Sequence, residues 1–157
     1  NKIKENNEIR GDIIVQSSKI RPIKASKEYY VNSTDEYPIL FVIAALTKGV
    51  SVFKGIEGLA NKESNRIIEM QNILKQVGIK SFLKKDELTI KGRGIFNAKS
   101  KKILVPNLGD HRICMSALIL SILIGANTSI KNFETVYTSS PSFLNIIKVL
   151  GVKFEKH

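Results

Sequence analysis

The chain has 157 residues, 25 Lys and Arg against 14 Asp and Glu, and a formal net charge of +11. With 43% hydrophobic residues it can form a core, which excludes a disordered polycation, and its one cysteine excludes an internal disulfide or a cysteine-based zinc cluster. The longest apolar runs, residues 38–46 and 114–126, are shorter than the roughly 20 residues that span a bilayer, and residues 1–8 show no signal peptide, so we expect a cytoplasmic protein with no membrane partner.

The first predicted elements lie between residues 36 and 91. Residues 36–48 are apolar on nearly every side and predict a buried helix with Asp35 as its N-cap. The β-branched residues 50–54 predict a strand. Residues 64–77 predict an amphipathic helix that ends at Gly78, with an apolar stripe made of Ile67, Ile68, Ile73, Leu74 and Val77. Residues 79–83 and 88–91 predict two strands paired around a turn.

A second series of elements follows the glycines at 92 and 94. The pattern predicts a strand at 103–105, a buried helix from about Asp110 to Gly125 and a strand at 128–131. Ser140 followed by Pro141 is typical of a helix start, so we expect the last helix to begin there.

The two series are copies of one repeat. Residues 72–80 align with 145–153, and residues 54–57 align with 131–134. The order in each copy is an acid, an apolar helix, a short strand, a helix and a glycine. The sequence therefore predicts an α/β (α+β) protein with repeated βαβαβ-type units, a polar lead-in at 1–9, a first repeat at 10–101 and a second at 102–157.

The basic excess is concentrated between Lys75 and Lys102, a stretch that contains nine basic residues and only two acidic ones. A nucleic-acid reader would place such charges beside stacking aromatics, yet only Phe82 and Phe96 lie among them. We interpret the stretch as a solvated lysine-rich face and expect no nucleic-acid partner. A basic nucleic-acid-binding module stays open as an alternative.

Charged residues gather at the predicted helix starts, in residues 33–38, 61–66 and 109–112. A helix N-terminus carries unpaired N–H groups and a partial positive charge, and therefore favours anions. Arg66 and Arg112, together with Lys62, could bind a phosphate and a carboxylate, because guanidinium groups pair with both in a bidentate manner. The carboxylates beside them could transfer protons.

These motifs resemble the EPSP synthase (3-phosphoshikimate 1-carboxyvinyltransferase) family. The resemblance rests on Asp35-Glu36-Tyr37-Pro38, Lys62-Glu63-Ser64-Asn65-Arg66, Gly109-Asp110-His111-Arg112-Ile113 and the helix start at residues 139–143, and residues 11–22 fit the family's strand before this region. It implies the enolpyruvyl transferase inside-out α/β barrel, with two domains of three repeats each. This chain would be most of the C-terminal domain, inactive without its partner, the N-terminal portion of the same enzyme. The complete enzyme would be a monomer.

The resemblance also implies the chemistry. The family transfers the enolpyruvyl group of phosphoenolpyruvate to the 5-hydroxyl of shikimate 3-phosphate, in aromatic amino acid biosynthesis, without a metal or a cofactor. By similarity, Asp35 would accept the hydroxyl proton and Glu63 would exchange a proton with the methylene carbon. Lys62 would bind shikimate 3-phosphate. Arg66 and Arg112 would bind phosphoenolpyruvate, and His111 would donate a hydrogen bond.

Each of these residues also has a purely structural interpretation. Asp35 could only cap a helix, and Asp110 is better explained as an N-cap or an anchor for Arg112 than as a proton carrier. His111 could be a packed structural histidine, and Cys114 is expected to be inert core.

Two positions depart from the family pattern, and one related activity stays open. Asn65 stands where the family has an acid, and Thr138 stands where many members have a lysine. The alternative enzyme is UDP-N-acetylglucosamine enolpyruvyl transferase, which shares the fold.

Overall fold

The computed structural model describes residues 2–5 and 8–155, with side chains from residue 11 onward. The described strands are β1 (Lys2–Glu5), β2 (Glu8–Gly11), β3 (Lys24–Ala25), β4 (Gly49–Lys54), β5 (Lys80–Lys84), β6 (Glu87–Gly92), β7 (Lys102–Val105) and β8 (Asn127–Ile130). The α-helices are α1 (Lys27–Ser33), α2 (Tyr37–Ala45), α3 (Arg66–Gln76), α4 (His111–Ile124) and α5 (Phe143–Val149). The short 3-10 helices are η1 (Thr34–Glu36), η2 (Glu57–Asn61) and η3 (Phe133–Thr138).

The described strands form separate sheets rather than one. A four-stranded sheet has the order β3-β4-β6-β5, in which β3 is parallel to β4 and the other pairs are antiparallel. β7 and β8 form a parallel pair, and β1 and β2 form an antiparallel hairpin. Both parallel pairs are joined through a buried helix, α2 or α4, which gives two β-α-β crossovers and confirms the α/β class.

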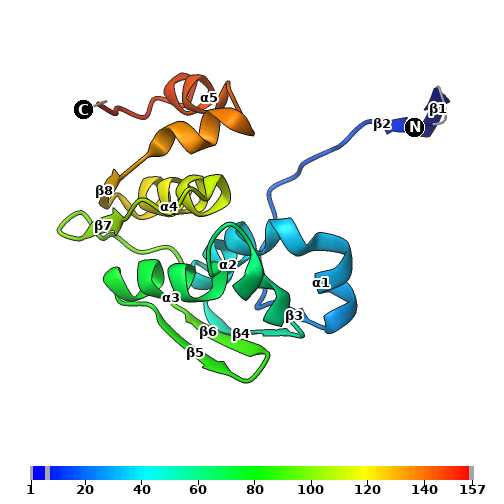
Figure 1. Cartoon of the computed structure of the whole chain (residues 1–157), viewed down its shortest axis with the longest axis horizontal. Coiled ribbons are helices and arrows are strands. Elements are labelled where there is room, and N and C mark those ends of the chain that lie inside the picture. The colour runs from blue at the N-terminus through cyan, green and yellow to red at the C-terminus, as the bar shows by residue number, and fades with distance from the viewer. Residues whose placement is uncertain (1, 6–7, 156–157) are drawn as a thin grey trace.

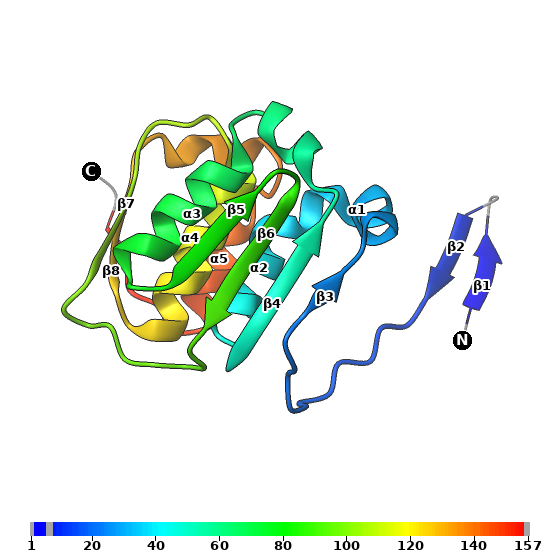
Figure 2. The same cartoon turned by 90° about the horizontal axis from the view of Figure 1, so that it is seen from below.

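The elements are stacked in layers. Figure 2 shows the four-stranded sheet in front of the helices, and Figure 1 shows α4 and then α5 lying beyond α2 and α3. Because α2 lies between the sheet and α4, it is buried on several sides, as the sequence predicted. The sheet approaches the end of α2 so closely at Gly92 that a Cβ there would lie 2.0 Å from the Thr47 carbonyl oxygen.

Segments that align in sequence adopt the same local structure. Gly55 and Asn132 occupy equivalent positions and both have a positive φ, 66° and 55°. Each is followed by a 3-10 helix, η2 or η3. Gly78 and Gly151 end α3 and α5 with φ of 81° and 85°, the left-handed backbone that favours glycine. The residue limits of the repeats, 10–101 and 102–157, stay a prediction, and residues 156 and 157 lie outside the described part.

The sequence prediction placed several elements correctly and others wrongly. The strands at 50–54, 79–83, 88–91, 103–105 and 128–131 are confirmed within one residue or so as β4 to β8. The last helix does not begin at Ser140-Pro141: α5 begins at Phe143, and its N-cap, Ser142, makes no side-chain capping bond. The predicted apolar stripe of α3 is confirmed except at Ile68, which is 41% exposed, and Met70 is buried in addition.

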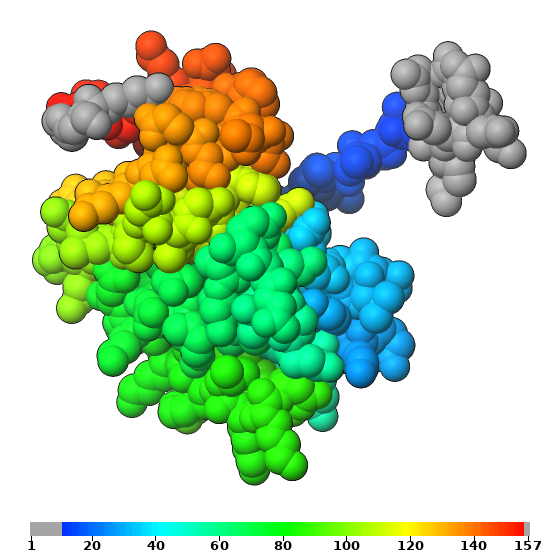
Figure 3. All heavy atoms as spheres, viewed as in Figure 1, coloured from blue at the N-terminus to red at the C-terminus, as the bar shows by residue number. Residues whose placement is uncertain are grey.

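The N-terminal part of the chain extends away from the packed body. Residues 12–22 belong to no strand, although the motif at 11–22 predicted one. This extended segment runs out from the packed body (Figure 3). Part of the predicted polar lead-in forms the β1-β2 hairpin. Residues 1, 6 and 7 of that lead-in lie outside the described residues.

Candidate functional site

Arg66 is the centre of a cluster of charged side chains. It lies at the first position of α3 and its side chain is 1% exposed. Its Nε donates to Asp110 Oδ2 at 2.9 Å, Nη1 to Asp35 Oδ1 at 3.1 Å, and Nη2 to Glu63 Oε2 at 2.6 Å. All three nitrogen atoms of the guanidinium therefore contact carboxylates that come from three different parts of the chain.

Arg112 joins the cluster from the start of α4. Its Nη2 lies 3.2 Å from Asp35 Oδ2, and its Nη1 donates to the Asp35 carbonyl oxygen at 3.0 Å. Nη1 is also 3.6 Å from Glu36 Oε1. The Arg112 side chain is 27% exposed, so it is more accessible to an anion than Arg66. Asp35 is thus held between two arginines.

Asp35 does not act as an N-cap, contrary to the sequence prediction. It lies within η1, and the N-cap of α2 is Glu36, which makes no side-chain capping bond. The competing ion pairs to Arg66 and Arg112 explain the difference, because a carboxylate bound to two guanidinium groups gains charge-assisted bonds that a backbone N–H does not match. The Asp35 side chain is still 51% exposed.

Asp110 does cap α4, as the sequence predicted. Its Oδ1 accepts from the backbone N–H groups of Arg112 and Ile113, at 3.0 and 3.3 Å. The other interpretation, an anchor for Arg112, holds only for the backbone N–H of that residue. The side chain it holds is Arg66, through Oδ2, which also accepts from Ser64 Oγ at 2.9 Å.

The arginines lower the pKa of two carboxyl groups in the cluster, those of Asp110 and Asp35. Burial raises the pKa of Asp110, but the hydrogen bond and charge of Arg66, with the hydrogen bond from Ser64, outweigh it and leave this pKa below its usual value. For Asp35, burial again raises the pKa, and the hydrogen bond from Arg66 with the charges of Arg112, Arg66 and Lys62 lowers it further than burial raises it. The contribution of Lys62 indicates that its charge lies near the cluster.

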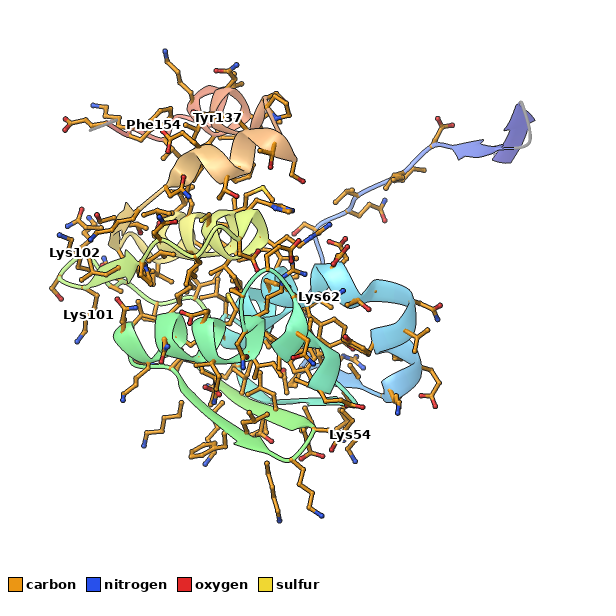
Figure 4. The ribbon with its side chains drawn as sticks, in the orientation of Figure 1. Lys54, Lys62, Lys101, Lys102, Tyr137 and Phe154 are labelled. Atoms are coloured by element: carbon orange, nitrogen blue, oxygen red, sulfur yellow. The ribbon has the colours of Figure 1, made fainter. Side chains whose placement is uncertain are left out.

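The remaining predicted residues differ in how they are held. Lys62 is exposed in the loop between η2 and α3, where Figure 4 labels it. Glu63 is half-exposed and pairs with Arg66. His111 is the first residue of α4 and half-buried, with no side-chain hydrogen bond to the described residues. The structure thus brings together Asp35, Glu63, Arg66 and Arg112, with Lys62 nearby.

The sequence prediction missed three members of the cluster and left two departures unexplained. Ser64 and Glu36 contact Asp110 and Arg112, respectively. The third is Asp110, whose contact with Arg66 compensates the burial of that arginine, and the sequence did not indicate this burial. Asn65, which replaces a family acid, is the N-cap of α3 and accepts from the Ile68 N–H at 3.1 Å. Thr138 donates to the Thr135 carbonyl oxygen.

Other features of the described residues lie away from the cluster. Cys114 is buried, and burial with the charge of Asp110 raises the pKa of its thiol to about 11, which fits the expected inert core residue. Within residues 2–5 and 8–155, no group of three or more His, Cys, Asp and Glu side chains is arranged to hold a metal ion. No helix in the described part of the chain is both long and apolar enough to cross a bilayer.

Comparisons with known proteins identify the family of the chain. The family model of EPSP synthase (3-phosphoshikimate 1-carboxyvinyltransferase) matches residues 3–147. The 3-phosphoshikimate 1-carboxyvinyltransferase of a Thermoanaerobacter species is 34% identical over 145 residues, which cover 92% of this chain and 33% of the relative. The enzyme of that name from Bradyrhizobium diazoefficiens is 30% identical over 157 residues, covering 96% of this chain and 33% of the relative.

Solved structures show the same relationship. An EPSP synthase from Acinetobacter baumannii aligns with a TM-score of 0.69 at 30% identity, over 83% of this chain and 30% of that one. The enolpyruvyl transferase NikO from Streptomyces tendae aligns with a TM-score of 0.53 at 16% identity, over 76% of this chain and 26% of that one, a likeness that shows the fold alone. The fold is thus that of the enolpyruvyl transferases.

Within that class, the chain belongs to the EPSP synthase (3-phosphoshikimate 1-carboxyvinyltransferase) family, as its motifs predicted. It spans about a third of the length of the curated relatives that it matches.

Proposed function

We propose that this chain supplies part of the active site of an enzyme that transfers the enolpyruvyl group of phosphoenolpyruvate to the 5-hydroxyl of shikimate 3-phosphate, with release of phosphate. The observation that carries the proposal is the meeting of three motifs at one place, where Asp35 pairs with both Arg66 and Arg112. Membership of the family supports the same reaction. Anionic reactants repel each other, so a site that holds them together needs cations, and the proton transfers need carboxylates beside them.

The carboxylates of the cluster are suited to the proton transfers. In the addition step the hydroxyl oxygen attacks C2 of phosphoenolpyruvate, its proton passes to Asp35, and Glu63 in its protonated form gives a proton to C3. In the elimination step C3 loses a proton to Glu63 and phosphate leaves, which restores the double bond. Asp35 and Glu63 both contact Arg66, and both are about half exposed, so they can be reached from solvent.

The pairing of Asp35 with Arg112 links binding to catalysis. Both arginines lower the pKa of Asp35, so it is ionised at neutral pH but weakly basic. An incoming anion that pairs with Arg112 weakens the ion pair between Arg112 and Asp35. The basicity of Asp35 then rises when the substrate is in place, which is when a base is needed.

The cations differ in how they can contact substrates. Lys62 is exposed and Arg112 is partly exposed, so we assign shikimate 3-phosphate to Lys62 and phosphoenolpyruvate mainly to Arg112. Arg66 can offer phosphoenolpyruvate only the N–H groups that its three carboxylates leave unused, and its burial makes it a weaker contact than Arg112. His111 has no side-chain hydrogen bond within the described residues and could donate one to a substrate.

The rest of the site would come from the rest of the enzyme. Because the chain covers a third of its relatives, we propose that it acts as one part of a longer enzyme that is monomeric when complete. Its single, buried cysteine is suited to a reducing cytoplasm. No nucleic-acid partner is proposed. Lys101, just before β7, and Lys102, its first residue, lie at one side of the molecule, away from Lys62 (Figure 4).

The test is phosphate release from the two substrates together. The isolated 157-residue chain should show no turnover, and activity should appear when it is mixed with the separately produced remainder of the enzyme. A reaction without shikimate 3-phosphate is the control and should release no phosphate. Turnover by the isolated chain would refute the division of the site, and an inactive complete enzyme would refute the proposed reaction.

A further inference from the structure

Asp110 has no exposed surface, and its two carboxylate oxygens perform separate tasks. Oδ1 accepts the two backbone N–H groups at the start of α4. Oδ2 accepts Arg66 Nε and Ser64 Oγ, both at 2.9 Å. An ionised carboxylate has about four acceptor sites, so these four bonds use its capacity. Asp110 therefore has neither the access nor a free acceptor site to bind a substrate itself.

The bond to Nε fixes the orientation of Arg66. The guanidinium is planar and presents its donors in a rigid fork, so anchoring Nε sets the direction of both terminal nitrogens. Those nitrogens hold Asp35 at 3.1 Å and Glu63 at 2.6 Å. A tilt of the fork would move both carboxylates relative to each other.

We propose that Asp110 is a positioning residue. It anchors Arg66 through Oδ2, so that Arg66 holds the carboxylates of Asp35 and Glu63 in the relative positions that the two proton transfers need. Its kinetic consequence rests on the proposed function, whereas its geometric consequence can be measured without any turnover. The N-cap role of Asp110 through Oδ1 is a separate task and can be preserved in a variant.

The variant Asp110→Asn separates the two tasks. Asparagine caps a helix as well as aspartate does, so its Oδ1 can keep the α4 bonds, but its amide turns a donor toward the Nε–H of Arg66. In the complete enzyme we expect kcat to fall on the order of 10²-fold, as for a misplacement of about 1 Å, with a much smaller change in either KM.

Asn65→Ala is the matched control. It removes the side-chain cap of α3 but no carboxylate from Arg66. We expect it to lower the melting temperature while kcat stays within about threefold of wild type, since no interaction of the transition state is removed. A folded Asp110→Asn enzyme with wild-type kcat would overturn the proposal, and so would an equal loss of kcat in Asn65→Ala.

A second measurement decides the matter if Asp110→Asn does not fold or if the enzyme shows no transfer activity. The Nε–H resonance of Arg66 in enzyme labelled with ¹⁵N-arginine is identified by its absence in Arg66→Lys. The Nε–H proton of Arg66 should exchange with water far more slowly than the Nε–H proton of Arg93, because Arg93 is exposed. Exchange as fast as that of Arg93 would overturn the proposal. Loss of transfer activity in wild type, with slow exchange at Arg66, would refute only the proposed reaction.

Discussion

Arg66 Nε and Asp110 Oδ2 lie 2.9 Å apart although 44 positions separate the two residues in the chain. Asp35 contacts the same guanidinium from the first predicted repeat, where it precedes a buried helix as Asp110 does in the second. Arg66 is therefore paired with such an aspartate from each predicted repeat. One of these aspartates is fully buried and the other is half-exposed, which leaves only Asp35 accessible to a reactant.

The first prediction concerns the stability of this buried pair. Replacing Arg66 with Met leaves Asp110 buried without its charged partner, so we expect the free energy of unfolding to fall by about 3–5 kcal/mol. Urea unfolding of the 157-residue chain measures the change. Arg112→Met is the matched control and should cost only about 0–1 kcal/mol, because its ion pairs are solvent-exposed. Equal losses for the two variants would contradict the account of Arg66.

The second prediction is a loss of stability in acid. The folded-state pKa values of Asp35 and Asp110 lie below their usual values, so the unfolded chain binds more protons in this range. Their stabilising contribution is present above the unfolded pKa of about 3.9 and is lost as the pH falls through the lower folded values. We therefore expect the free energy of unfolding, measured with urea, to fall as the pH is lowered from about 5 to about 3, because the carboxyl groups of the unfolded chain bind protons in this range.

Asp110→Asn provides the comparison for that acid effect. Because it removes one of the titrating groups and keeps the cap, the dependence of its unfolding free energy on pH should be shallower than that of wild type. The same slope in both proteins would show that Asp110 does not carry the effect.

The elements governed by local chemistry could be predicted from sequence. Asp110 caps α4, and Gly78 adopts the left-handed backbone that ends α3, because both depend on neighbours in the chain. Asp35 was predicted as a cap and is not one, because partners 31 and 77 positions away, Arg66 and Arg112, compete for its oxygens. No local pattern reports such distant partners.

Two other differences have the same origin. The family resemblance predicted a strand at residues 11–22, but residues 12–22 pair with no strand in the described chain, and a strand requires a partner. The candidate site was predicted from charges at helix starts and from the family resemblance, and the structure brings four of the named residues, Asp35, Glu63, Arg66 and Arg112, into contact. That Arg66 would be buried among three carboxylates, rather than open to a ligand, depends on packing between α3 and α4.

The third prediction separates Arg112 from Arg66 as a substrate contact. Arg112→Ala in the complete enzyme should raise the KM for phosphoenolpyruvate by roughly 10- to 100-fold, as expected for losing a hydrogen bond to a charged group. Steady-state kinetics with phosphoenolpyruvate as the varied substrate measure it. Arg93→Ala is the matched control, since Arg93 stacks on Phe96 outside the cluster, and its KM should be unchanged. An unchanged KM in Arg112→Ala would make Arg112 a structural residue.

The most direct test of the central claim is the rate of phosphate release by the complete enzyme with Asp35 replaced by Asn. Asn has nearly the shape of Asp but cannot accept the hydroxyl proton. With phosphoenolpyruvate and shikimate 3-phosphate both present, wild type should turn over, and Asp35→Asn should lower kcat by roughly 10²- to 10⁴-fold while changing either KM much less. Asp35→Asn with the kcat of wild type, or with a raised KM and an unchanged kcat, would contradict the assignment of Asp35 as the base.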